Sequence, residues 1–113
     1  MSETKITDPK TGGQKGVKEE RFDLMPFDAL EEVARVYGAN VRIAKYPIDN
    51  WTKGYAWRLS FGALLRHVGK ALMGEDRDEE TGCLHLACAA WHCLTLIAFL
   101  RRRVGTDDRA KIQ

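Results

Sequence analysis

The sequence is 113 residues long, which allows one domain at most. Its hydrophobic content of 44% and charged content of 30% are those of a globular protein with a modest core, which oligomerisation would help to bury. A net charge of +2 with scattered basic residues does not support binding to nucleic acid. Three cysteines without a C-x-x-C pair, and no signal peptide, favour reduced thiols in a cytoplasm.

Residues 1–17 form a polar leader that contains Gly12, Gly13 and Gly16, and we expect it to be flexible. The folded domain is predicted over residues 18–104, and a charged tail that frays over residues 105–113. Lys18 and Arg21, at the start of the domain, suit phosphate contacts, although solvated surface charge explains them equally simply.

Apolar residues recur at three- and four-residue spacing in three stretches, whereas alternation with a period of two is not evident. We therefore predict an all-α fold, a small helical bundle with about three main helices that is completed by oligomerisation. The first helix is predicted over residues 26–37, ending at Gly38, the second over 57–73, ending at Gly74, and the third over 82–103.

The connection between the first two helices, residues 41–53, carries large aromatic side chains among lysines. One interpretation is that Tyr46 and Trp51 stack on a base while the neighbouring Lys45 and Lys53 contact its phosphates. The alternative is that Tyr46 and Trp51 close the end of a helix bundle.

The most informative stretch is the acidic turn between the second and third helices. Its carboxylates are those of Glu75, Asp76, Asp78, Glu79 and Glu80. His67 precedes this corner and His85 follows it, each within about two helical turns, so the two imidazoles can face each other. Oxygen and imidazole ligands where two helices meet suit a divalent metal. The alternative is structural, because acidic residues also cap the start of a helix.

Residues 84–100 are apolar enough to raise the question of a membrane span, with Arg101 to Arg103 as a charged flank. His85, His92 and Thr95 lie inside this run, where polar groups would be costly in lipid. A helix that is buried within a bundle explains the run better, so we expect no membrane partner. The cysteines of this helix, Cys83, Cys88 and Cys93, are expected to be small core residues.

Five motifs in chain order carry a family resemblance. They read Arg21-Phe22-Asp23-Leu24-x-Pro26, Asn50-Trp51-x-x-Gly54, Arg66-His67, Gly74-Glu75-Asp76-x-Asp78-x-Glu80-Thr81-Gly82-x-x-His85-Leu86, and Ala89-Ala90-Trp91. This pattern resembles the phage-associated N-terminal domain of dATP/dGTP diphosphohydrolases, which is similar to the all-α MazG-like nucleotide pyrophosphohydrolases.

The resemblance implies hydrolysis of a deoxynucleoside triphosphate, dGTP or dATP, to monophosphate and pyrophosphate. It further implies magnesium or manganese, with zinc not excluded by the histidines, a homo-oligomer, and a place in the host cytoplasm, where it would serve 2-aminoadenine nucleotide metabolism. The residues that it implies are metal ligands at His67, Glu75, Asp76, Asp78 and His85, catalytic carboxylates at Asp78 and Glu80, and nucleotide contacts at Lys18, Arg21, Lys45, Asn50 and Trp51.

Two departures from the pattern are visible. MazG-like relatives carry Glu-Glu-x-x-Glu on one helix, whereas Glu31-Glu32 is followed here by Arg35. Relatives often read His-Ala-Ala-Trp-Asn where this chain has Cys88-Ala89-Ala90-Trp91-His92. The alternative function is therefore a non-catalytic helical protein that binds a nucleotide or a partner.

Overall fold

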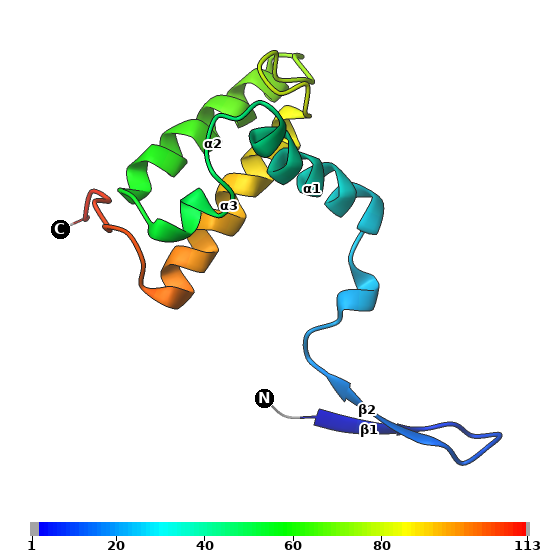
Figure 1. Cartoon of the computed structure of the whole chain (residues 1–113). Coiled ribbons are helices and arrows are strands. Elements are labelled where there is room, and N and C mark those ends of the chain that lie inside the picture. Colours follow the sequence, from blue (N-terminus) through cyan, green and yellow to red (C-terminus); the bar gives the residue numbers. More distant parts are fainter. Residues whose placement is uncertain (1–2, 113) are drawn as a thin grey trace.

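A computed structural model describes residues 3–112 as a β-hairpin followed by three long helices (Figure 1). The strands are β1 (Glu3–Thr7) and β2 (Gln14–Lys18), and the helices are α1 (Phe27–Arg42), α2 (Trp57–Leu72) and α3 (His85–Arg102). Two short 3-10 helices, η1 (Phe22–Leu24) and η2 (Asn50–Lys53), lie in the connections. The three predicted helices are confirmed, but the all-α fold class is wrong at the leader.

The leader forms an antiparallel hairpin in which Glu3 pairs with Lys18 and Thr7 with Gln14. Its turn is closed by the Asp8 carboxylate, which accepts hydrogen bonds from the backbone N–H groups of Lys10 at 2.8 Å and Thr11 at 3.0 Å. Figure 1 shows the hairpin projecting away from the helices. Local turn chemistry therefore gives the leader its structure without burial of a core.

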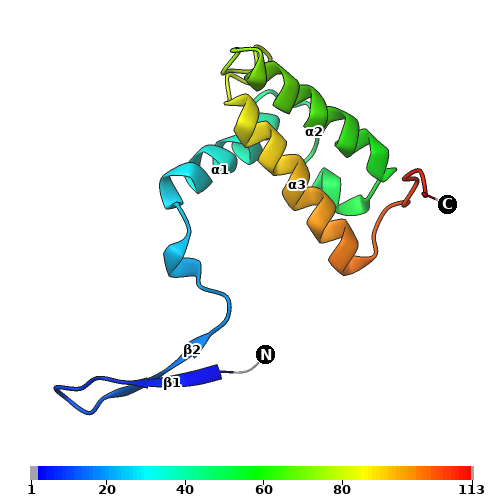
Figure 2. The same ribbon diagram turned by 180° about the vertical axis from the view of Figure 1, so that it is seen from behind.

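Helices α2 and α3 form an antiparallel pair, and Figure 2 views this pair from the side opposite to that of Figure 1. Trp57 at the start of α2 packs with Leu96 and Phe99 near the end of α3 in one hydrophobic cluster. Leu65, Leu72, Ile97 and Leu100 of the same two helices remain exposed. No helix in the described part of the chain is long and apolar enough to span a membrane.

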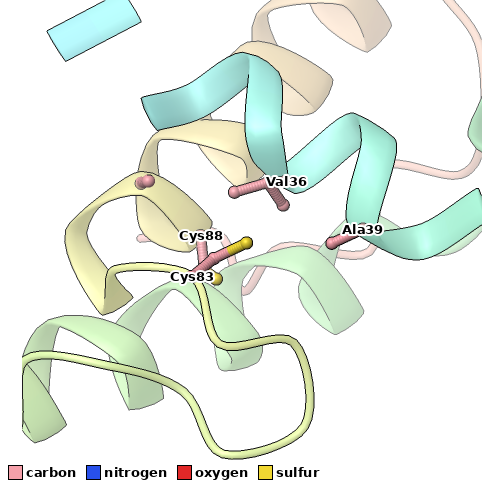
Figure 3. Packing of buried hydrophobic residues seen from close by; sticks show 5 residues of the cluster. Val36, Ala39, Cys83 and Cys88 are labelled. Atoms are coloured by element: carbon pink, nitrogen blue, oxygen red, sulfur yellow. The ribbon is translucent and has the colours of Figure 1, made fainter. Parts of the chain in front are cut away.

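Helix α1 packs against the beginning of α3, where Val36 and Ala39 meet Cys83 and Cys88 (Figure 3). The helix continues to Arg42, so the prediction that it ends at Gly38 is wrong. A glycine inside a helix costs about 1 kcal/mol. Burying apolar side chains on both sides of that glycine offsets this cost.

The cysteine prediction is confirmed in part. Cys83 and Cys88 are buried in the core, as expected, whereas Cys93 is exposed on α3. All three are free thiols.

The start of the tail contacts the beginning of α2, while fraying of the tail stays a prediction. The backbone N–H of Trp57 donates to the carbonyl of Thr106, and its indole Nε1–H donates to the carbonyl of Val104 at 2.9 Å. Gly105 makes this approach feasible, because it has a φ of +77° and a Cβ there would lie 2.4 Å from the carbonyl oxygen of Tyr55. The tail therefore satisfies donors at the first turn of α2.

Candidate functional site

The loop between α2 and α3 is a compact turn that fixes the first residues of α3. Gly74 ends α2 with a φ of +94°. The backbone N–H of His85 donates to the carbonyl of Asp76 at 2.7 Å, and that of Asp78 donates to the carbonyl of Cys83 at 2.8 Å. These bonds hold Asp78 next to the beginning of α3.

The Asp78 carboxylate is oriented by Thr81. Its Oδ2 accepts the backbone N–H of Thr81 at 3.1 Å and the hydroxyl of the same residue at 3.0 Å. Burial by itself would raise the pKa of Asp78, but these hydrogen bonds, with His67 and His85 nearby, outweigh burial and lower the pKa below its ordinary value. Asp78 is therefore an anion near neutral pH.

His67 and His85 face each other across the helix pair, as the sequence predicts. Their Nδ1 atoms are 2.8 Å apart, and both side chains are buried. On the other side of the ring, the Nε2 of His85 lies 2.6 Å from Oε2 of Glu75. If that Nε2 carries the proton and donates to Glu75, the Nδ1 of His85 presents a lone pair, and the Nδ1–H of His67 donates to it.

Arg66 completes this chain of contacts, with its Nη2 3.3 Å from Nε2 of His67. Burial, and next the positive charge of Arg66, lower the pKa of His67 below its ordinary value. A neutral imidazole is the form that binds a metal ion. The electrostatics of this corner thus keep His67 in that form near pH 7.

Three donor groups at this corner could hold a metal ion together. Ligand atoms of His67, Asp78 and His85 all lie within 4.8 Å of one another. Two other predicted ligands have different surroundings: Glu75 contacts the far nitrogen of His85, and Asp76 contacts the backbone of His85 through its own carbonyl. The structure therefore brings together three of the five predicted ligands as one donor group.

The three-group cluster lies beside a cleft of about 910 Å³ that runs between α1, η2, α2 and the acidic loop. His67 and Asp78 line this cleft, together with the predicted residues Lys45, Asn50, Trp51 and Glu80. Lys45 Nζ forms an ion pair with Glu80 Oε1 at 2.8 Å, which raises the pKa of Lys45.

Two predicted nucleotide contacts are not among the residues that line the cleft. Lys18 ends strand β2, and Arg21 follows it, where its guanidinium pairs with Asp23 at 2.9 Å. Neither residue is among those that line the cleft. Glu31 and Glu32 of α1 are also outside the lining, and both pair with Arg35.

A second polar group in the cleft was not predicted. Ser60 of α2 is fully buried, and its Oγ lies within hydrogen-bond distance of the Tyr55 hydroxyl and 2.9 Å from Nδ1 of His92. Burial, and next His67 and Arg66, lower the pKa of His92 to about 4. The ring of His92 stacks on that of His67 with centroids 6.0 Å apart. Ser60 lies seven residues before His67, and His85 lies seven residues before His92. This repeated spacing places each pair on one helix face and is the sequence signal for this second group.

Trp91, next to His92, also lines the cleft. Its ring packs against Tyr37 with centroids 5.8 Å apart, and its buried Nε1 has no hydrogen-bond partner in the described part of the chain. Trp51 packs against Phe99 with centroids 6.4 Å apart. The cleft thus combines a charged region around Asp78 with an aromatic region around Trp51 and Trp91.

The fold and the cleft define a small helical domain with a histidine–carboxylate site at one end of a helical hairpin. Residues 9–109 match the model of the family described as dATP/dGTP diphosphohydrolase, N-terminal, and the chain belongs to this family. It is 37% identical over 79 residues to a dATP/dGTP diphosphohydrolase of Salmonella phage PMBT28. The matched region covers 70% of this chain and 26% of the relative, so the chain spans about a quarter of that protein's length. No solved structure matches the chain.

Proposed function

We propose that this chain is a metal-dependent deoxynucleoside triphosphate pyrophosphohydrolase, which converts dGTP or dATP to the monophosphate and pyrophosphate. The observation that carries the proposal is the group of His67, Asp78 and His85, whose ligand atoms lie within 4.8 Å of one another beside the cleft. Membership of the dATP/dGTP diphosphohydrolase family supports the same reaction class.

The donor set fits a divalent cation. Two imidazole nitrogens and one carboxylate oxygen suit manganese or zinc, and they suit magnesium when water and phosphate oxygens supply the remaining ligands. A cation bound there would polarise phosphate oxygens and neutralise the charge that develops on the leaving pyrophosphate. We propose Mg²⁺ or Mn²⁺ as the cofactor.

The chain's own residues take distinct roles. Asp78, held by Thr81, would bind the cation, and the cation would orient the reacting phosphate. Glu80 lines the cleft and is the candidate general base for water, while Lys45, its ion-pair partner, turns to the triphosphate. Asn50 and Trp51 contact the nucleoside from η2.

The contacts of Glu75 and Asp76 suggest supporting roles in place of direct ligation. With the proton on Nε2 of His85, that N–H donates a hydrogen bond to the Glu75 carboxylate, and the lone pair of the opposite nitrogen, Nδ1, is directed toward the cluster. Asp76 fixes the backbone of His85. Lys18 and Arg21 lie outside the cleft lining, so nucleotide contacts from them remain predictions.

The setting that we propose is the cytoplasm of an infected host, in 2-aminoadenine nucleotide metabolism. We also propose a homo-oligomer, because Leu65, Leu72, Ile97 and Leu100 leave an apolar surface exposed on α2 and α3. The relation to MazG-like enzymes remains a prediction.

A non-catalytic nucleotide-binding role is the second candidate. The observation in its favour is that Arg35 pairs with Glu31 and Glu32, so α1 adds no carboxylate to the cluster.

The test is to incubate the purified protein with each deoxynucleoside triphosphate, with and without Mn²⁺, and to identify the products. We expect monophosphate and pyrophosphate in the presence of metal, and loss of turnover in Asp78→Ala and His85→Ala. Glu79→Ala is the matched control, since it removes a carboxylate from the same loop outside the cluster. Binding without turnover by the wild-type protein would favour the second candidate, and neither binding nor turnover would refute both.

A further inference from the structure

The hydroxyls and imidazole at the aromatic region of the cleft form one hydrogen-bonded chain. Tyr55, Ser60 and His92 all line the cleft, with the Ser60 Oγ between the Tyr55 hydroxyl and the His92 Nδ1. Ser60 is fully buried, so water does not compete for its hydroxyl. Since Ser60 has one proton to donate, the direction of its hydrogen bond with Tyr55 is coupled to that with His92.

The chain has two self-consistent arrangements of protons. In the first, Tyr55 donates to Ser60 and Ser60 donates to Nδ1 of His92, so His92 carries its proton on Nε2 and offers a donor. In the second, Nδ1–H of His92 donates to Ser60 and Ser60 donates to Tyr55, so Nε2 offers an acceptor. Both arrangements pair the Ser60 hydroxyl with Tyr55 and with Nδ1 of His92, and they interconvert by rotation of hydroxyls and a change of imidazole tautomer.

The two substrate purines of the proposed reaction differ in hydrogen bonding at position 6. Guanine has a carbonyl there, which accepts, and adenine has an amino group, which donates. Most fixed side chains would hydrogen-bond to one of these groups and leave the other unpaired. In a buried site, the unpaired group would make the enzyme strongly prefer one purine over the other. A site that accepts both purines needs a group that can present either a donor or an acceptor.

We propose that Tyr55, Ser60 and His92 form a reversible hydrogen-bond relay that reads position 6 of the purine base and so lets one site accept both dGTP and dATP. This inference rests on the proposed function and adds the residues that set its base specificity. Trp51 and Trp91 supply flat apolar surfaces for the base in the same part of the cleft. His92 stacks on His67, so the relay adjoins the cluster assigned to the phosphates.

Removal of the tyrosine hydroxyl affects the two arrangements unequally. In Tyr55→Phe, Ser60 still donates to His92 in the arrangement that suits guanine. In the arrangement that suits adenine, the Ser60 hydroxyl loses its acceptor while it remains buried. An unsatisfied buried donor is costly enough to reduce a rate by roughly tenfold. We therefore expect kcat/KM for dATP to fall about tenfold relative to dGTP in this variant.

Two more substrates separate position 6 from position 2. dITP has the 6-carbonyl without the 2-amino group, and 2,6-diaminopurine deoxynucleoside triphosphate has both amino groups. The relay predicts that dITP behaves like dGTP and that the diaminopurine nucleotide behaves like dATP in Tyr55→Phe. If the activities of Tyr55→Phe instead divide the four nucleotides by the presence of the 2-amino group, the proposal is overturned.

A double-mutant cycle tests the coupling. Ser60→Ala breaks the relay, so adding Tyr55→Phe to it should leave the dATP to dGTP ratio unchanged. Tyr46→Phe is the matched control, since Tyr46 lines the cleft without a place in the relay, and we expect its ratio to equal that of wild type. Circular dichroism checks folding, and the ring of Tyr55 keeps its edge-on contact with Phe99 in the phenylalanine variant.

The outcomes distinguish the two proposals. A wild-type protein that hydrolyses neither purine nucleotide would refute the proposed function and the relay with it. Hydrolysis of both, with a Tyr55→Phe ratio equal to that of wild type, would overturn the relay alone. A selective loss of activity toward 6-amino purines that disappears in the Ser60→Ala background would establish it.

Discussion

Replacing Glu75 with glutamine tests how the cluster holds its orientation. The carboxylate lies 2.6 Å from Nε2 of His85, whose side chain is 2% exposed, while that of Glu75 is 44% exposed. A hydrogen bond to a charged group contributes about 1.5–3 kcal/mol, and the exposure of Glu75 reduces this to about 1–1.5 kcal/mol. Because 1.4 kcal/mol corresponds to a factor of ten, we expect Mn²⁺ affinity to fall roughly tenfold.

Isothermal titration calorimetry of Mn²⁺ binding measures this change directly. Glu79→Gln is the matched control, because it removes one negative charge from the same exposed loop and leaves the His85 contact in place. Equal affinities of the two variants would refute an orienting role for Glu75. A loss well beyond a hundredfold would instead make Glu75 a direct ligand.

Three further predictions concern charge, backbone and pH. Lys45→Ala should raise KM for the nucleotide about tenfold. The free energy of unfolding in urea should change by less than ~1 kcal/mol, because the Lys45–Glu80 pair is exposed. An unchanged KM would exclude a phosphate contact. Gly105→Ala should lower the free energy of unfolding by more than ~2 kcal/mol. Gly74 also has a positive φ but has open space around it, so Gly74→Ala should lower the free energy of unfolding by only about 1 kcal/mol. Equal losses in the two variants would contradict close packing at Gly105. The folded pKa of His92 is about 4, below the ordinary 6.5, so the unfolded chain binds more protons between these values and stability must fall as pH drops through that window. The free energy of unfolding in urea should fall between pH 7 and pH 5 by about 1–2 kcal/mol more in wild type than in His92→Gln. An equal fall in the two proteins would argue against a neutral buried His92.

The sequence was sufficient to predict that two imidazoles meet at one corner of the helix pair. Helical spacing placed His67 and His85 at one corner, and their ring nitrogens are 2.8 Å apart. What spacing could not resolve was which carboxylate reaches them. Asp78 does so because Thr81 and the backbone of Cys83 fold the loop around it, and these loop hydrogen bonds follow no helical or strand period.

The errors in the fold have similar physical origins. The hairpin of the leader depends on Asp8 accepting two backbone N–H groups, a local contact that composition does not reveal. Gly38 reads as a helix end, but the core beyond it, at Ala39, favours continuation of α1. The contact of the tail with Trp57 joins residues nearly fifty positions apart, and no local pattern encodes it. The seven-residue spacings of Ser60 and His67 and of His85 and His92 indicate shared helix faces, but the bond between Ser60 and His92 forms only when α2 and α3 pack.

The position of the donor cluster along the chain links cation binding to closure of the helical hairpin. His67 lies before the turn, Asp78 within it and His85 after it, so one ion held by all three would be a non-covalent cross-link around a short loop. Such a cross-link lowers the entropy of the unfolded chain in the way that a disulfide does, but it is reversible and depends on ion concentration. The amides of the loop would then be the reporters of occupancy, since their hydrogen exchange should slow as the ion binds, before any substrate is added.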